Sequence, residues 1–466
     1  NFADNVSALD TLLGVGRNYD VVNRYLWIGG RRARLWVLDG YGEDAVLERM
    51  GAFWLGVLPD AASGITEMQD FVDRFVSFCE VTVSRDCRDI ATAMLLGKTV
   101  LLVEGCTGGA LIDAKKYPGR AVTEPAGGKV LRGSHDGFVE TLLHNTALIR
   151  RRIRDPRLTM ECHKIGDSSR TDVVLCYMEN LVDPKLLAEV RAKVKGIRVN
   201  SLAMSQESVA EAMMARQWYN PYPKVRYTER PDAATACVME GDIVLLVDNS
   251  PSVLLLPTTF FSFTQEANDF YFPPLVGSYL RILRILVFLL SLVITPLWYL
   301  LASHPELLPA ALQFLAVKEA GGVPLLAQLL IVEFLIDLLK LASLNTPDAL
   351  SNSFSMLGAL ILGDFAVQAR WLVPEVLVYM AFVSIATFAQ PSFELGYAFK
   401  LQRVALLLLI SVLEWWGFGL GLLGMLLLLA TTKPIAGRGY LYPLVPFDGR
   451  ALHSLLLRRP ISRKNT

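Results

Sequence analysis

Charge is scarce in this chain of 466 residues, since Asp, Glu, Lys and Arg together make up only 19% of it. Basic and acidic side chains balance to a formal net charge of +0, so bulk electrostatics does not favour a nucleic-acid partner. Hydrophobic residues reach 53%, and they are unevenly placed. Charges recur every few residues up to about 270, whereas apolar side chains dominate 285–431. The composition therefore predicts a globular region followed by a membrane-embedded one.

The sequence also lacks the features of a secreted or redox protein. Its six cysteines include no C-x-x-C pair, and Cys162 beside His163 has no second ligand pair at metal spacing. We therefore expect reduced, mostly buried thiols, no metal site and no cofactor. Residues 1–16 contain neither a basic n-region nor a long apolar run. No signal peptide is expected, and the N-terminal region should lie in the cytosol.

Motifs for catalysis are missing as well. The glycine-rich turn Gly105–Gly109 lacks the Lys-Ser/Thr of a P-loop. None of the five histidines falls into a nucleophile–base motif, and no pair of acidic residues stands out. We expect that the protein is not an enzyme.

Strand-like and helical patterns alternate before the apolar region. The stretch Val100–Ile112 (VLLVEGCTGGALI) resembles Val244–Leu256 (VLLVDNSPSVLLL), and each has two apolar runs that flank a turn. This similarity predicts a duplicated α/β unit. The expected fold is a cytosolic α/β region of two related subdomains, then an all-α transmembrane domain and a basic tail, with boundaries 1–133, 134–275, 276–432 and 433–466.

A basic cluster ends the helical pattern of Asp136–Arg154. Its members are Arg150, Arg151, Arg152 and Arg154. The cluster is interpreted either as a contact with another subunit or the membrane surface, or as a solvated helix end that complements its own dipole.

Five apolar segments follow, at 285–301, 324–341, 354–369, 371–389 and 401–431. The first is just long enough to cross a bilayer core of about 30 Å, and Arg281 and Arg284 before it place its start in the cytosol. The C-terminal tail is basic and is expected in the cytosol too, so the number of crossings should be even. We expect four spans, with 324–341 as a re-entrant or interfacial element. The alternative splits 401–431 at Glu414, although each half would be short for a span.

Two of these segments carry charges. Glu333, Asp337 and Lys340 follow one another at i, i+4 and i+7, so they share one stripe of a helix. This stripe faces water, a partner helix or a pore, or it belongs to an amphipathic element with paired Asp337 and Lys340. A transporter site around Glu333 and Asp337 is a weaker alternative. Asp364, inside 354–369, is costly in lipid and is therefore a functional candidate.

Several long blocks resemble the GerA family of spore germination proteins. They include Arg132–Leu158, Arg226–Asp248, Pro257–Phe263, the GALILGDFAVQA stretch and Pro391–Gly396. Together the blocks cover essentially the whole chain. Other stretches, among them HPELLP at 304–309 and the tail, are more similar to a sporulation-protein branch of the family than to the A subunits of nutrient germinant receptors.

The resemblance implies a subunit of a ring-shaped, pentameric ion channel that releases ions during germination. It implies a place in the spore inner membrane, and the basic flanks described above put both termini in the cytosol. The implied partners are further copies of the chain, a small integral membrane protein, other germination receptor subunits and membrane lipid, with no nucleic acid. An A subunit of a nutrient germinant receptor, or a non-conducting signalling or scaffold subunit, is the alternative.

The family's pore-lining element matches 354–369 of this chain. The resemblance therefore assigns Met356, Leu357, Ile361 and Asp364 to the pore. Ordinary helix packing is the alternative for the three apolar residues. The family more often has Gln where Asp364 stands, and a ring of carboxylates at a pore position would favour cations.

Overall fold

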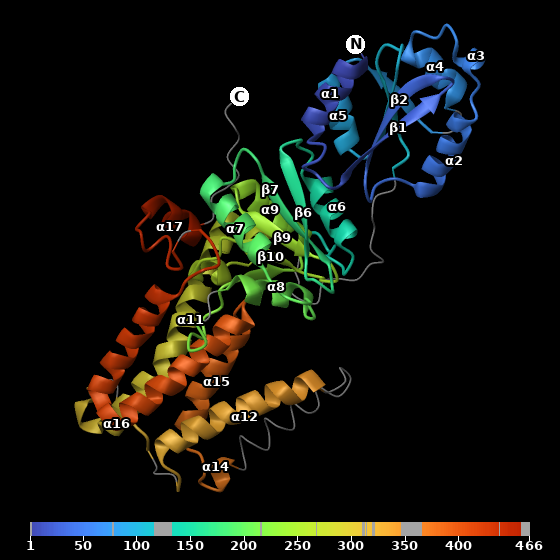
Figure 1. Cartoon of the computed structure of the whole chain (residues 1–466). Helices are drawn as coiled ribbons and strands as arrows, with labels where there is room; N and C mark the ends of the chain where they lie inside the picture. The colour runs from blue at the N-terminus through green and yellow to red at the C-terminus, as the bar shows by residue number, and fades with distance from the viewer. Residues whose placement is uncertain are drawn as a thin grey trace. The chain divides into compact units, whose positions relative to one another are not determined.

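The computed structural model divides into two compact units. The α/β unit comprises 1–215, 225–258 and 434–438, and the helical unit comprises 216–224, 259–433 and 439–466 (Figure 1). The residues that the structure describes are 2–76, 79–115, 133–214, 217–266, 268–309, 313, 315–318, 322–345, 366–437 and 439–457.

The α/β unit contains two five-stranded antiparallel sheets, one in each half of its chain. The elements of the first half are α1 (Phe2–Leu13), β1 (Val21–Ile28), β2 (Arg31–Leu38), α2 (Asp44–Leu55), α3 (Pro59–Ala62), α4 (Met68–Phe75), β3 (Val81–Ser84), α5 (Cys87–Leu95), β4 (Thr99–Val103) and β5 (Gly109–Ile112). Those of the second half are α6 (Leu142–Arg152), β6 (Leu158–Ile165), β7 (Thr171–Met178), α7 (Pro184–Gly196), α8 (Ser205–Met213), β8 (Arg226–Thr228), α9 (Pro231–Glu240), β9 (Ile243–Val247) and β10 (Val253–Leu256).

The two sheets have the same topology, which confirms the two related subdomains. The strand order is β1-β2-β4-β5-β3 in one sheet and β6-β7-β9-β10-β8 in the other. The similar sequence stretches form equivalent hairpins, β4–β5 with Thr99 opposite Ile112 and β9–β10 with Ile243 opposite Leu256. Because each pair of strands is joined by a polar or glycine-containing turn, the local sequence determines these hairpins.

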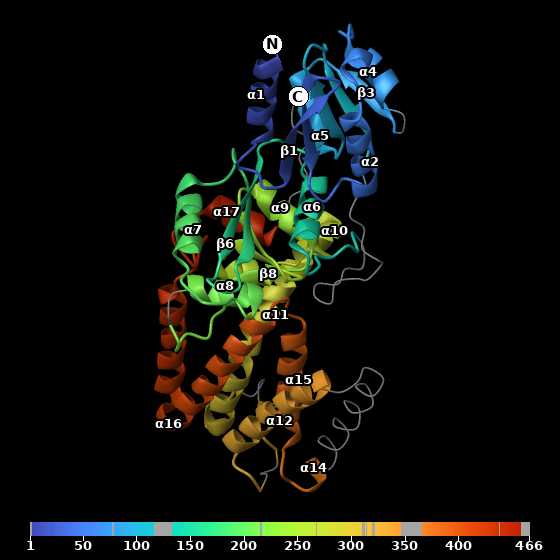
Figure 2. The ribbon, with the colours of Figure 1, turned by 45° about the vertical axis from the view of Figure 1, so that its right-hand side comes forward.

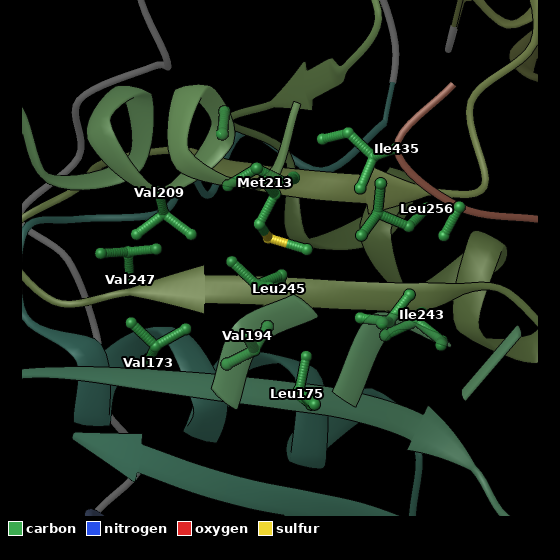
Figure 3. Packing of buried hydrophobic residues seen from close by; sticks show 14 of the residues in the cluster. Val173, Leu175, Val194, Val209, Met213, Ile243, Leu245, Val247, Leu256 and Ile435 are labelled. Atoms are coloured by element: carbon green, nitrogen blue, oxygen red, sulfur yellow. The ribbon is translucent and has the colours of Figure 1, made fainter. Parts of the chain in front are cut away.

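Helices cover both faces of each sheet. In the second sheet, Val173 and Leu175 of β7 face Val194 of α7 together with Val209 and Met213 of α8 (Figure 3). The alternate β7 residues point to the other face, toward α6 and α9. In the first sheet, α1 and α5 cover one face, and α2, α3 and α4 cover the other. All five residues of β4 and of β9 are buried, as expected for central strands with helices on both sides.

Helix α6 joins the two sheets of the α/β unit. The Arg150 guanidinium donates from Nε and Nη2 to the two carboxylate oxygens of Asp20, at 2.9 and 3.1 Å. Its Nη1 donates to the Leu158 carbonyl oxygen at 3.0 Å. Tyr41 of the first subdomain donates its hydroxyl to the Ala147 carbonyl of α6. These buried polar contacts hold one subdomain against the other.

The helical unit is built from apolar helices. Its elements are η1 (Phe260–Thr264), α10 (Asn268–Tyr271), α11 (Pro274–Ser303), η2 (Pro305–Leu307), α12 (Leu325–Asn345), α14 (Ala366–Gln368), α15 (Pro374–Phe388), α16 (Phe393–Thr431) and α17 (Gly449–Leu456). Among the described residues, α11 and α16 are long and apolar enough to cross a membrane, and α15 is a shorter apolar helix. Stacked aromatic rings join α11 to its neighbours. The ring centroids of Phe288 and Phe399 of α16 lie 3.8 Å apart, and those of Trp298 and Tyr379 of α15 lie 4.5 Å apart.

Helix α16 is a hairpin of two helices and not one continuous span. The backbone of Glu414 is non-helical, with φ 51° and ψ −125°, and the two arms meet at a sharp bend there (Figures 1 and 2). The arms pack closely, because a Cβ at Gly417 would lie 2.2 Å from the Leu409 carbonyl oxygen. At 1.5 Å per residue the arms are about 30 and 25 Å long. The structure thus follows the split at Glu414 that the sequence left as the alternative, since the first arm begins earlier, at Phe393.

Candidate functional site

The helical unit holds a cluster of five charged side chains, which we call the charge cluster. Its members are Glu333, Asp337 and Lys340 of α12 and Lys400 and Arg403 of α16. The i, i+4 and i+7 spacing on α12 brings the first three to one side of that helix, as the sequence predicted. The i, i+3 spacing on α16 directs Lys400 and Arg403 toward them.

Glu333 and Arg403 form the buried centre of the charge cluster. Arg403 Nε donates to Glu333 Oε1 at 2.6 Å, and the two side chains are only 3% and 4% exposed. Arg403 Nη1 also donates to the carbonyl oxygen of Ser291 on α11, at 2.9 Å. One guanidinium therefore ties α12, α16 and α11 together.

Lys400 bridges the two carboxylates of α12. Its Nζ donates to the Glu333 carbonyl oxygen at 2.9 Å and lies 3.4 Å from Glu333 Oε2. The same ammonium forms an ion pair with Asp337. The Lys340 ammonium lies over the rings of Phe388 and Tyr397, at 5.1 and 5.5 Å. One interpretation of the sequence paired Asp337 with Lys340. In the structure Asp337 forms an ion pair with Lys400, which the sequence did not indicate.

The charge cluster surrounds a cavity of about 10 Å³, which is room for about one water molecule. Asp337 Oδ1 is buried beside it without a hydrogen-bond partner in the part of the chain that the structure describes. Three cations outnumber two carboxylates, so the charge cluster is positive overall. Charges held among apolar helices are costly and generally mark a functional position. The arrangement combines buried charges with space for about one water-sized polar species.

The residues predicted to line a pore lie outside the described part of the chain. These are Met356, Leu357, Ile361 and Asp364, and their assignment stays a prediction. The structure does describe both ends of the stretch that contains them. The Gly322 amide, just before α12, donates to the Arg370 carbonyl oxygen at 2.9 Å, so the chain before α12 meets the chain after α14.

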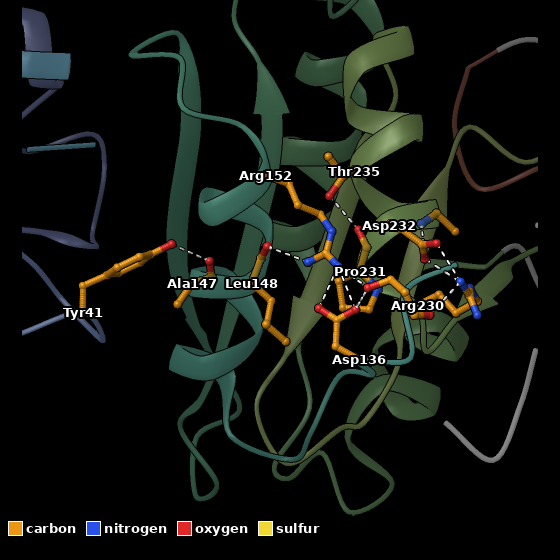
Figure 4. A network of polar contacts seen from close by, with 11 residues as sticks. Tyr41, Asp136, Ala147, Leu148, Arg152, Arg230, Pro231, Asp232 and Thr235 are labelled. Atoms are coloured by element: carbon orange, nitrogen blue, oxygen red, sulfur yellow. Dashed lines mark hydrogen bonds and ion pairs between the residues drawn. The ribbon is translucent and has the colours of Figure 1, made fainter. Parts of the chain in front are cut away.

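The four arginines of the basic cluster at the end of α6 lie in different environments. Arg150 is fully buried on Asp20, and Arg152 donates to both oxygens of Asp136 at 2.7 Å (Figure 4). Arg151 and Arg154 are exposed. Arg150 and Arg152 thus bind carboxylates of the same chain, and an interface role stays a prediction for the exposed Arg151 and Arg154.

Three cysteine thiols of the α/β unit lie in environments that disfavour the thiolate. Burial raises the pKa of Cys162 to about 11 and that of Cys176 and Cys237 to about 12. These thiols are protonated, and therefore poorly nucleophilic, at neutral pH. No group of three or more His, Cys, Asp or Glu suited to a metal ion occurs among the described residues.

Sequence reasoning missed Lys400 and Arg403, the α16 half of the charge cluster. A signal was present, because two cations three residues apart inside a long apolar stretch need a partner. Which carboxylate pairs with them depends on helix packing, and sequence spacing within one helix does not report it.

The comparisons with known proteins agree on one protein family. The family model described as Bacillus/Clostridium GerA spore germination protein matches residues 8–466. The chain is 35% identical to stage V sporulation protein AF of Bacillus subtilis over 98% of this chain and 92% of that protein. It is 30% identical to the uncharacterized membrane protein YfkQ of the same organism, over 85% of this chain and 77% of that protein.

Two further relatives carry germination names. Spore germination protein KA of Bacillus subtilis is 29% identical over 84% of this chain and 72% of its own length. Among solved structures, the N-terminal domain of the A subunit of the Bacillus megaterium germinant receptor GerK3 aligns with 55% of this chain and 95% of its own. The identity there is 22% and the TM-score 0.43. With a family model that spans almost its entire length, this chain belongs to the GerA family of spore germination proteins.

Proposed function

We propose that this chain is a subunit of an oligomeric, pentameric ion channel of the spore inner membrane that releases ions during germination. The observation that carries the proposal is the charge cluster, with Glu333 and Arg403 buried among the apolar helices α11, α12 and α16. Such a cluster is expensive in a helix bundle with no task involving charge. Membership of a germination family supports the physiological setting.

The proposed membrane topology has both termini in the cytosol. Because the Gly322 amide bonds to the Arg370 carbonyl, the stretch between them begins and ends at one depth and contributes an even number of crossings. Outside that stretch, α11, α15 and the two arms of α16 supply four crossings. At about 22 Å, α15 is the shortest of the four, and local thinning of the bilayer would accommodate it. The basic residues near the start of α11 and in the tail favour the cytosol for both ends.

In the proposed channel, the stretch between Gly322 and Arg370 supplies the pore element. It carries the charge-cluster helix α12 at its start and Met356, Leu357, Ile361 and Asp364 further on. Copies of Asp364 around a ring would give a ring of carboxylates, which favours cations. A small integral membrane protein, and other germination receptor subunits, are the proposed partners.

Asp364→Asn tests the pore assignment directly. With purified protein in liposomes, we expect the variant to lower the preference for cations over anions by about an order of magnitude, because the carboxylate ring is lost. Asp348→Asn is the matched control, since it removes a carboxylate outside the apolar segment 354–369. Native mass spectrometry of the same samples gives the number of subunits.

Two results would decide against the proposal. Unchanged selectivity of Asp364→Asn in an intact assembly would remove this residue from the pore. A ring-shaped assembly that shows no ion leak under any condition would favour a signalling or scaffold subunit.

A further inference from the structure

A short loop of the helical unit lies against the end of α16. The Gln217 side-chain amide donates to the Thr431 carbonyl oxygen at 3.5 Å, and the Asn220 amide donates to Thr432 Oγ1 at 2.7 Å. Thr431 is the last residue of α16. The loop 217–224, which follows α8 in the sequence, is therefore placed at the C-terminal end of an apolar helix.

The base of this loop is firmly packed. The Tyr222 ring is buried and meets Phe399 edge-to-face at 6.2 Å. It also lies 6.4 Å from the ring of Tyr440, whose hydroxyl donates to the Pro223 carbonyl oxygen at 2.8 Å. Contacts on both sides of the tip thus fix the direction in which the tip projects.

The tip itself is aromatic and uncovered. Trp218 is 96% exposed and Tyr219 is 56% exposed, and their rings meet edge-to-face at 6.2 Å. A nearly fully exposed tryptophan on a fixed loop loses the benefit of burying its large apolar ring. Trp and Tyr have an apolar body and a polar group, the combination that favours the membrane–water interface.

The position of the tip matches one face of the bilayer. The second arm of α16 begins beside Trp415 and Trp416, which are 45% and 80% exposed, and it ends at Thr431. That arm is about 25 Å long, close to the thickness of a hydrocarbon core. Trp415 and Trp416 therefore mark one interface, and Trp218 lies at the end of the arm that marks the other.

The charge of the loop also suits lipid headgroups. The loop 217–224 contains no acidic residue and its Lys224 is buried, whereas Lys433, which follows the end of α16, is exposed. Basic and aromatic side chains together complement phosphate-bearing headgroups and the acyl boundary beneath them. A second copy of the chain would need a partner surface for these rings, whereas the embedding proposed for the helical unit brings the bilayer to the end of α16.

We propose that Trp218 and Tyr219 insert into the lipid headgroup region at the face of the membrane where α16 ends, and that loop 217–224 is a membrane anchor. The anchor rests on the embedding of the helical unit that the proposed function requires, but it does not depend on ion conduction.

Photocrosslinking of the full chain tests the anchor. Trp218 is replaced by p-benzoylphenylalanine, the protein is reconstituted in phosphatidylglycerol–phosphatidylethanolamine vesicles, and lipid adducts are identified by mass spectrometry after illumination. The same replacement at Trp416 is the positive control. Replacement at Trp27, which is 62% exposed on the α/β unit, is the negative control. We expect adducts at 218 to approach those at 416 and to exceed those at 27 by about tenfold.

The controls separate the two proposals. Adducts at 416 without adducts at 218, or crosslinks from 218 to another protein chain, overturn the anchor and leave the embedding of the helical unit intact. The absence of adducts at both 416 and 218 overturns the embedding and, with it, the channel. Because the Tyr222 contacts lie outside the replaced residue, the loop base should fold normally, and circular dichroism of the variant verifies this.

Discussion

The α/β unit and the helical unit each contain a buried arginine paired with a buried carboxylate, Arg150 with Asp20 and Arg403 with Glu333, yet the surroundings of these two pairs differ. Arg150 and Asp20 are 0% and 4% exposed, and Arg403 and Glu333 are 3% and 4% exposed. Arg150 meets Asp20 through two hydrogen bonds and a backbone carbonyl through a third, which leaves one neutral, closed pair. Arg403 belongs to a cluster with excess positive charge, a small cavity and an Asp337 oxygen that has no hydrogen-bond partner among the described residues.

This difference separates a structural pair from a functional candidate. The Asp20 charge and hydrogen bonds keep Arg150 ionised, because they outweigh the burial that lowers its pKa and leave that pKa above its usual value. A closed pair of this kind positions two subdomains and carries no net charge. The charge cluster has spare charge and space for a water-sized species, so its polarity exceeds the needs of packing.

The largest expected effect comes from breaking the closed pair. Asp20→Ala leaves the buried Arg150 charge without its partner, and we expect the α/β unit to lose about 3–5 kcal/mol of unfolding free energy. Chemical denaturation of the purified protein, followed by circular dichroism, measures the loss. Arg17→Ala is the control, since its pair with Glu179 is about half exposed and should contribute less than about 1 kcal/mol.

A companion variant sharpens this test. Asp20→Leu combined with Arg150→Met removes both charges and should recover most of the lost stability, because no unpaired charge stays buried. If Asp20→Ala proves as mild as Arg17→Ala, the pair does not hold the two subdomains together.

An intermediate effect is expected in the charge cluster. Glu333→Gln keeps the size of the side chain but removes the charge that faces Arg403 and Lys400, and it should destabilise the helical unit by about 2–3 kcal/mol. Ion leak from liposomes should also change, because α12 loses its main tie to α16. Thermal unfolding in detergent and flux assays measure the two effects.

Asp337→Asn is the matched control within the same helix. The Asp337 side chain is 31% exposed, and one of its oxygens has no partner in the described part of the chain, so removal of its charge should cost only about 1 kcal/mol. Equal destabilisation by Asp337→Asn and Glu333→Gln would show that the buried Glu333–Arg403 contact is not the centre of the cluster.

The smallest effect concerns a partly exposed group in the α/β unit. Burial lowers the pKa of His163, with Lys195 and Arg191 acting in the same direction and Glu161 opposing them. The unfolded chain therefore binds the proton more readily, so this contribution to stability is present above the unfolded pKa of about 6.5 and is lost as the pH falls.

His163→Gln isolates this contribution. The variant should show a slightly flatter decline in unfolding free energy between pH 7.5 and pH 5.5 than the parent protein, as measured by denaturation at a series of pH values. An identical decline in both proteins would mean that His163 titrates alike in the folded and unfolded states.

Local chemistry explains why much of the α/β unit was predictable. The Gly105–Gly109 turn joins β4 and β5 as expected, and Asp183 accepts from the Lys185 amide at the start of α7, where Pro184 occupies the first turn. The internal similarity of Val100–Ile112 and Val244–Leu256 also indicated the duplication. These features depend on residues close in sequence, where turn and capping preferences act.

The helical unit was less predictable because its decisive contacts are between distant segments. Hydropathy alone presents 401–431 as continuous, whereas the bend at Glu414 is stabilised by the close packing of Gly417 on Leu409 across the hairpin. The α16 partners of Glu333 were likewise hidden, since Arg403 is seventy residues away along the chain. The aromatic tip at Trp218 was not recognised, because its neighbour is the end of α16.

The sequence by itself determined the division into an α/β region and an apolar helical region, the duplication, the polar stripe on α12 and the family. Periodicity, turn chemistry and extended similarity carry that information along the chain. Only the tertiary structure decided that Arg150 is a closed internal pair, that Lys400 and Arg403 complete the charge cluster, and that α16 is a hairpin. The physical reason is that the energy of a buried charge depends on its partners in space, and these come from helices that the sequence places far apart.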